Sequence, residues 1–426
     1  MFNFPFRGKL TTGCRPAPGN RLFGTNHRAG SRPCGDPMHA TTSPHSGRPS
    51  ALSLARYACS NPMRALGRKA YRRLPTALTL AALLSGTPAL PDQDAETGAP
   101  IAGLAVGLDA LRWQSHTSLV AEFMDYHQLG LRWLRTDLNW ASVQSAGPDS
   151  YDWRDMDRIV AMARMHDMKV LPAVGSLPDW AWTTDADGRK IRDARAFGRF
   201  MQAAAERYAP QNIHVWEIWN EPNLQGPFPP HPDASAYAAL LKEAAAAIRD
   251  TDPGAIVLLG GLAAVMVTDL DGDPAAISAL DFLETIYAEG AGSSFDAVGF
   301  HPYTGTALPD PSDPQNGWGL MSGPLRDIMA ANGDGSKPIW VTEYGAPTNI
   351  GGGGTSHDDQ ARMLGSAADL AQRTPWIDAL FWYSYRDLGD DPQNREDWFG
   401  LIDAQGHPKP ARAAFERILL QLQKVR

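Results

Sequence analysis

After Pro91, short apolar runs alternate with longer amphipathic stretches along the chain. The runs are rich in β-branched and aromatic residues and are bounded by Gly, Pro, Asn or Asp, which is typical of buried parallel strands. Eight strands are therefore predicted, at Ile101–Val106, Leu131–Thr136, Lys169–Val174, Ile213–Trp219, Ala255–Gly260, Phe295–Phe300, Pro338–Thr342 and Asp378–Ser384.

The stretches between these runs carry apolar residues at three- and four-residue spacing, which predicts amphipathic helices. Phe197, Phe200 and Met201 form one such stripe, and the last predicted helix lies near Pro410–Gln423. Eight strands, each followed by a helix, indicate a closed (β/α)8 TIM barrel that forms a single domain over residues 91–426. The alternative is a doubly wound open sheet. Such a sheet usually carries a phosphate-binding GxGxxG or GxxxxGK[ST] loop, and neither motif occurs in the sequence.

Composition and charge narrow the class of protein. Hydrophobic residues make up 43% and charged residues 20%, which allows a large core. The net charge of −8 conceals an asymmetry, because residues 1–90 hold a single acid, Asp36, among many bases. The remaining body is strongly acidic, so nucleic acid and anionic membrane surfaces are disfavoured as partners.

The N-terminal region predicts a secretory signal. Residues 1–62 are rich in Pro, Gly, Ser and Arg without periodicity, and we expect them to be disordered or a mis-assigned extension, with translation starting at Met63. Residues 63–90 follow with a basic segment, the apolar run Leu74–Leu84, and small residues Thr87 and Ala89 before a cleavage site. The alternative is a disordered basic leader with a chance apolar patch. The signal predicts a secreted or periplasmic bacterial protein.

No metal or cofactor is expected in the barrel. The three cysteines all precede residue 60, and the chain has neither an HExxH nor a CxxC motif. Asp269, Asp271 and Asp273 resemble the start of a calcium loop, but Pro274 and Leu280 stand where that loop needs Gly and Glu, so a solvated turn is favoured.

Two glutamates stand at predicted strand ends, where this barrel builds its chemistry. Glu221 follows strand four in Val215–Asn223 (VWEIWNEPN), and Glu343 ends strand seven in Pro338–Pro347 (PIWVTEYGAP). Glycosidic bond cleavage needs such a pair, one carboxyl protonated as the acid and one ionised as the nucleophile. The alternative for each is a salt-bridged strand-end residue.

These motifs resemble clan A of the glycoside hydrolases, most closely family 39 and the neighbouring family 5. The resemblance covers the barrel from Ile101 to about Leu420. It implies a retaining glycosidase with Glu221 as acid/base and Glu343 as nucleophile, about 5 Å apart.

The resemblance also implies substrate-binding roles at other strand ends. Arg135 would orient the nucleophile, Asn220 would bind the sugar 2-hydroxyl, and His301 and Tyr303 would contact nucleophile or sugar. Trp382 would form the floor under the sugar, and Trp180, with Trp182, would widen that platform.

The expected substrate is an oligosaccharide or polysaccharide. Family 39 β-xylosidases carry a β-sandwich domain that this sequence is not expected to contain, which favours endo-cleavage of β-glycosidic bonds in a bacterial exopolysaccharide or plant-type glycan by a monomer. Two alternatives stay open, an exo-acting β-xylosidase-like enzyme and a carbohydrate-binding barrel without catalysis.

Overall fold

A computed structural model describes residues 99–268 and 275–424 of the chain. The predicted leader, the predicted signal segment and the three aspartates at 269, 271 and 273 lie outside these residues, so the interpretations that concern them stay predictions.

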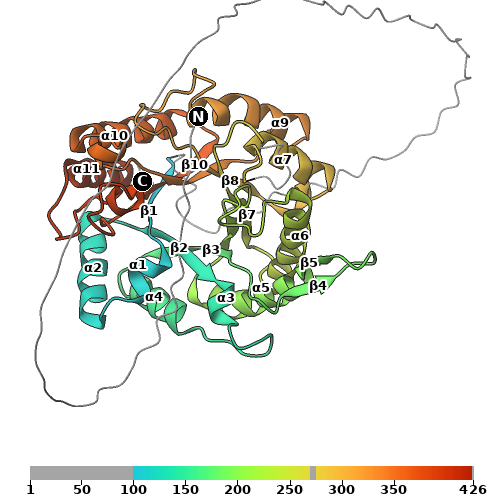
Figure 1. Ribbon diagram of the computed structural model, residues 1–426. Helices are drawn as coiled ribbons and strands as arrows, with labels where there is room; N and C mark the ends of the chain where they lie inside the picture. The colour runs from blue at the N-terminus through green and yellow to red at the C-terminus, as the bar shows by residue number, and fades with distance from the viewer. Residues whose placement is uncertain (1–98, 269–274, 425–426) are drawn as a thin grey trace, which may run out of the picture. The chain divides into compact units, whose positions relative to one another are not determined.

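Eight parallel strands close into a barrel at the centre of Figure 1, in the order β1-β10-β9-β8-β7-β6-β3-β2. The barrel strands are β1 Ile101–Ala105, β2 Trp133–Asn139, β3 Lys169–Gly175, β6 Val215–Asn220, β7 Ile256–Ala263, β8 Ala297–His301, β9 Ile339–Tyr344 and β10 Ile377–Tyr383. All eight coincide with the predicted runs to within a few residues, which confirms the (β/α)8 barrel.

Helices surround the barrel on all sides (Figure 1). They are α1 Leu108–Arg112, α2 His116–Leu129, α3 Trp140–Val143, α4 Arg154–Met165, α5 Ala194–Tyr208, α6 Ala234–Thr251, α7 Ala279–Ala288, α8 Gly317–Leu320, α9 Arg326–Ala331, α10 His357–Arg373 and α11 Pro410–Lys424. Side-chain caps begin several of them: Ser115, Asp193 and Asp233 each accept a hydrogen bond from a backbone N–H of the first turn.

A two-stranded antiparallel hairpin was not predicted. It consists of β4 (Trp182–Thr184) and β5 (Lys190–Arg192), in the loop after β3, and projects from the ring of helices at the right of Figure 1. Arg192 is buried at its base, where the guanidinium lies 3.9 Å from the Phe228 ring centroid and donates to the carbonyl of Pro229. The hairpin is thereby fixed to the loop that follows β6.

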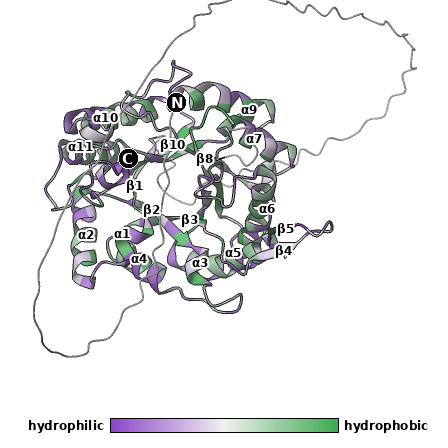
Figure 2. Ribbon diagram, in the orientation of Figure 1, coloured by the Kyte–Doolittle hydropathy of each residue, from purple (hydrophilic) through white to green (hydrophobic). Residues whose placement is uncertain are grey.

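The core has two layers, one inside the barrel and one between the strands and the helices. Figure 2 shows that apolar residues occur along both the strands and the helices. Large aromatic side chains fill the part of the barrel interior that lies below the mouth. Trp133 packs edge-on to Trp340, which stacks on Phe381. Since side chains alternate along a strand, the next inward positions lie one layer nearer the mouth, and these positions carry polar groups. No helix of the described part of the chain is long and apolar enough to cross a bilayer.

Candidate active site

Arg135, on β2, links three side chains at the barrel mouth. It is the inward residue after Trp133 and, because β2 extends to Asn139, it lies inside the strand rather than at the predicted strand end. Its Nε donates to Glu217 at 2.5 Å, Nη1 to Glu343 at 2.6 Å and Nη2 to the Asn220 side chain at 2.7 Å. Burial would lower the pKa of Arg135, and the charges of both carboxylates more than offset this, so the guanidinium is charged.

Side chains do not alternate between the two faces at the end of β6. Two successive residues, Asn220 and Glu221, both point into the mouth of the barrel. Trp219 adopts a positive φ of 75° and packs outward among the apolar core, with its indole N–H donating to the Pro227 carbonyl. Glu221 follows at φ 43°. Such conformations cost non-glycine residues about 1–3 kcal/mol each and are concentrated at functional sites.

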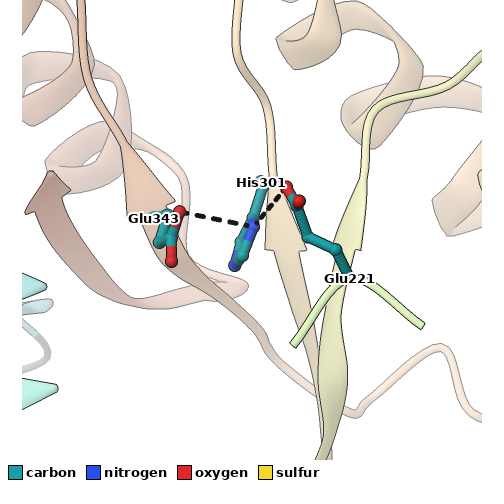
Figure 3. Close-up of side chains that lie close together, drawn as sticks. All are labelled: Glu221, His301 and Glu343. Atoms are coloured by element: carbon teal, nitrogen blue, oxygen red, sulfur yellow. Dashed lines mark hydrogen bonds and ion pairs between the residues drawn. The ribbon is translucent and has the colours of Figure 1, made fainter. Parts of the chain in front are cut away.

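His301, at the end of β8, lies between the two glutamates (Figure 3). Its Nδ1 is 3.0 Å from Oε1 of Glu221 and 3.7 Å from Oε2 of Glu343. The ring fits because residue 261 on β7 is glycine, where a Cβ would stand 2.1 Å from Nε2 of His301.

A hydrogen-bond chain fixes the orientation of this imidazole. The buried carboxylate of Glu217 accepts from Thr342 Oγ1 at 2.7 Å and from the Gly261 N–H at 2.9 Å. A hydroxyl has one proton, so Thr342 must accept at its oxygen from the Nε2–H of His301, 3.1 Å away. In the neutral ring Nδ1 is then an acceptor that faces Glu221.

Glu343 is held ionised by its surroundings. Burial alone would raise its pKa, but the charge of Arg135 and hydrogen bonds from Tyr303 and Arg135 hold the pKa below its ordinary value. Tyr303 donates at 3.0 Å, and burial followed by the charge of Glu343 raises the pKa of its hydroxyl far above the usual range, so it stays a donor.

The two glutamates are close enough for double displacement. One ligand atom each of Glu221, His301 and Glu343 lies within 4.8 Å of the others. Retaining glycosidases hold their carboxyl groups about 5–5.5 Å apart, whereas inverting enzymes leave about 6.5–9.5 Å for a water. The expected spacing of about 5 Å agrees with this geometry.

A family model described as cellulase, glycosyl hydrolase family 5, matches residues 95–384. The chain belongs to glycosyl hydrolase family 5. It is a clan A glycoside hydrolase and a retaining glycosidase. No curated protein matches the chain.

Solved structures with the same barrel include members of families 39 and 5. A family 39 glycoside hydrolase from Bacteroides cellulosilyticus WH2 is 22% identical, with a TM-score of 0.58 over 76% of this chain and 64% of its own. A monomeric β-xylosidase from Caulobacter crescentus CB15 is 20% identical, with a TM-score of 0.55 over 74% and 67%. GH5_18 from Streptomyces cattleya, in complex with GlcNAc, is 18% identical, with a TM-score of 0.57 over 76% and 80%. The chain thus spans less than two thirds of the first of these, and at such identities the likeness shows the fold.

Trp382 of this family 5 chain does not lie at the mouth, contrary to the prediction. It is fully buried in the layer between barrel and helices, edge-on to Tyr344, and its indole N–H has no hydrogen-bond partner among the described residues. On β10 the inward side chains are Ala379, Phe381 and Tyr383, so Trp382 points outward by alternation. The half-buried Tyr383, next along the strand, packs on Phe399 at the mouth instead.

The other predicted residues are divided between two places. Arg135, Asn220, Glu221, His301, Tyr303 and Glu343 come together in one hydrogen-bonded cluster. Trp180 lies in the loop after β3, where its indole N–H donates to the Gln144 carbonyl at 2.7 Å and its ring packs on Trp140.

Sequence reasoning missed Glu217 and Thr342. Glu217 is fully buried in the middle of β6, between Trp216 and Ile218. A carboxylate inside a buried apolar strand requires a charged partner. The position of Glu217 inside an apolar run could therefore have indicated a buried ion pair, although the sequence does not reveal its partner.

A metal ion is an alternative ligand of this site. Among the described residues, the side chains close enough to bind one ion together are those of Glu221, His301 and Glu343. Both oxygens of Glu343 already accept hydrogen bonds, from Arg135 and Tyr303, and Nδ1 of His301 faces Glu221. The donors fit a hydrogen-bonded catalytic pair better than a metal centre. Independence from metal and cofactors stays a prediction.

Proposed function

We propose that Glu343 is the nucleophile and Glu221 the acid/base of this glycosidase. The observation that supports the assignment is the asymmetry of their partners. Glu343 accepts from a cation and a phenol, while Glu221 faces the Nδ1 of an imidazole whose other nitrogen donates to Thr342. The carboxyl O–H of a protonated Glu221 can donate a hydrogen bond to Nδ1 of a neutral His301, so Glu221 can be the protonated partner.

The reaction then proceeds in two displacements. An oxygen of Glu343 attacks the anomeric carbon while the glycosidic oxygen leaves with the proton of Glu221, which gives a covalent glycosyl-enzyme. Glu221, now a carboxylate, takes a proton from water, and the hydroxide displaces Glu343. Asn220, oriented by Arg135 through its amide oxygen, can donate from Nδ2 to the sugar 2-hydroxyl.

We propose an endo-acting enzyme that cleaves β-glycosidic bonds of a polysaccharide, either a bacterial exopolysaccharide or a plant-type glycan. The description of the family as cellulase supports a polymer substrate, and a xylanase from Thermotoga petrophila RKU-1 in complex with xylobiose shares the barrel at a TM-score of 0.53. An exo-β-xylosidase is the second candidate, supported by the likeness to the Caulobacter β-xylosidase. Early products distinguish them, since an endo enzyme releases oligosaccharides and an exo enzyme releases monosaccharide.

Azide rescue tests the assignment of the two glutamates. Glu221→Ala loses proton transfer, which an activated aryl glycoside does not need in the first step, so the covalent intermediate should accumulate. Added azide should then restore turnover and give a β-glycosyl azide. Glu343→Ala should lose turnover on every substrate.

The reverse result would exchange the roles: rescue of Glu343→Ala with an α-azide, while Glu221→Ala stays inactive on activated substrates. If wild type and both variants bind the same glycan and none turns it over, the chain is a carbohydrate-binding barrel.

A further inference from the structure

Lys409 is a buried lysine with no part in the proposed mechanism. It directly precedes α11 and is only 4% exposed. Its ammonium group donates to the Asp387 carboxylate at 2.7 Å, the Thr348 hydroxyl at 2.9 Å and the Trp398 carbonyl at 3.2 Å. An ammonium group has three protons, so all of them are used. Taking two charges out of water offsets most of their attraction, so stability alone is a weak reason for such a pair.

The acceptors of this ammonium group belong to two loops at the mouth of the barrel. Thr348 lies in the loop after β9, the strand of the proposed nucleophile, and Asp387 and Trp398 lie in the loop after β10. The Trp398 carbonyl also accepts from the N–H and the hydroxyl of Thr348, at 3.1 and 3.2 Å. Asp387 accepts from the Gly400 N–H at 2.7 Å. The ion pair and Thr348 therefore fix the backbone on both sides of Phe399.

Phe399 packs against the phenol that holds the proposed nucleophile. Its ring lies edge-on to Tyr303, with ring centroids 6.0 Å apart, and 5.2 Å from the Tyr383 ring. Its carbonyl accepts from the Ser384 N–H at 3.1 Å. Tyr303 in turn donates to Glu343 at 3.0 Å. A displaced Phe399 would leave Tyr303 without this lateral support, and a hydrogen bond weakens steeply when its geometry is poor.

We infer that Lys409 is a positioning residue of the glycosidase, because it holds the Tyr303 hydroxyl against Glu343 through the loop that follows β10. Since all three protons of its ammonium group are already bound, it acts on the nucleophile through this loop rather than directly. Interior side chains are close-packed, so a displacement at one contact is passed to the next. The inference rests on the proposed assignment of Glu343 as the nucleophile.

The test removes the ammonium group without changing the net charge. A double variant combines Lys409→Met with Asp387→Asn, and the Asn side chain can still accept from the Gly400 N–H. With Phe399 less restrained, the acid limb of kcat/KM on an aryl glycoside should move to higher pH, by no more than in Tyr303→Phe. At the pH optimum kcat should fall about tenfold, because the nucleophile is oriented less well.

Two further variants separate positioning from a structural role. Thr348→Val keeps the ion pair but removes one donor to the Trp398 carbonyl, so it should move the limb in the same direction by a smaller amount. In a Tyr303→Phe background, the Lys409 double variant should not move the limb further, because the hydroxyl through which it acts is absent.

Lys337→Met combined with Asp334→Asn is the matched control. The Lys337 ammonium group donates to Asp334 at 2.7 Å and to the Gly292 carbonyl at 2.6 Å. This pair precedes β9, so it lies at the end of the barrel opposite the mouth. Its removal should leave the limb in place.

The outcomes separate the positioning role from the assignment on which it rests. If Tyr303→Phe moves the limb but neither the Lys409 double variant nor Thr348→Val does, the positioning role is refuted and the assignment of Glu343 stands. Equal shifts in the wild-type and Tyr303→Phe backgrounds would also refute it. If none of these variants moves the limb, the assignment of Glu343 and the positioning role are refuted together.

Discussion

At the scale of single residues, the site depends on donors to both oxygens of Glu343. Arg135 donates to one of these oxygens and Tyr303 to the other. The depressed pKa of Glu343 means that its ionised form persists to lower pH than an ordinary carboxylate. On the acid side, activity should therefore be lost only when the pH falls through that depressed pKa of Glu343.

Tyr303→Phe should move the acid limb of kcat/KM to higher pH. The variant removes a hydrogen bond to the ionised form of Glu343, so the pKa of Glu343 rises and protonation inactivates the enzyme at a higher pH. The measurement is a pH profile on an aryl glycoside. Tyr287→Phe, which removes a comparable bond to Asp334 on the helix layer, should leave the limb in place. An unmoved limb in Tyr303→Phe would contradict the proposed role of the phenol.

Glu217→Gln should destabilise the fold. The amide would leave the buried Arg135 with one fewer counter-charge. Its NH2 would also face a donor in either orientation, the Arg135 Nε–H at one oxygen position or the Thr342 hydroxyl and the Gly261 N–H at the other. Breaking a buried pair typically costs about 3–5 kcal/mol in the free energy of unfolding, measured by denaturant titration. Asp187→Asn, in an exposed pair with Arg189, provides the comparison and should have little effect. A loss below about 1 kcal/mol would show that Arg135 does not need Glu217.

At the scale of elements, the positions of the strands could be predicted from the sequence. Which side chains at the strand ends point into the barrel could not. Apolar runs bounded by Gly, Pro and Asp identified all eight barrel strands, because a strand buried on both faces is apolar throughout. For the same reason its sequence does not reveal which face points inward. Trp382 was therefore predicted at the mouth, whereas Tyr383 lies there. The two strands of the β4–β5 hairpin, three residues each, are too short and polar to carry a strand signal.

Two variants on β10 should distinguish its inward-facing side chain at the mouth from its outward-facing side chain in the core. Tyr383→Ala should lower kcat/KM on an aryl glycoside about tenfold or more with little change in Tm, since Tyr383 is half-buried at the mouth. Trp382→Ala should lower the free energy of unfolding by about 3–5 kcal/mol, since it leaves a cavity in the core. Kinetics and thermal denaturation on both variants give the answer. A catalytic loss confined to Trp382→Ala would contradict the outward orientation of Trp382.

At the scale of the whole molecule, the fold followed from the order of strands and helices. The two glutamates of the site followed from their strand-end motifs, and its other four residues followed from the resemblance to clan A. Closing the barrel brings the ends of β6 and β9 to one mouth, so their position in the strand order was sufficient. The hydrogen bond between Thr342 and Glu217 depends on how side chains pack inside the barrel, and the spacing of apolar residues does not predict that packing.

Export is the prediction that belongs to this scale. The basic segment and apolar run of residues 63–90 should direct secretion, with cleavage after Ala89. Mass spectrometry of the exported protein should find a mature N-terminus at Leu90. An exported chain that starts upstream of Met63 would contradict both the predicted signal and the predicted start.

The reach of Arg135 has a consequence for when the enzyme becomes active. Its partners lie 82, 85 and 208 positions further along the chain, and β1 joins β10 only when the barrel closes. Contacts between distant residues form late, because the chain must first lose the entropy of closing long loops. A nascent or half-unfolded chain therefore holds its glutamates apart and cannot cleave a glycan. During refolding, turnover should return together with barrel closure, after the local helices have formed.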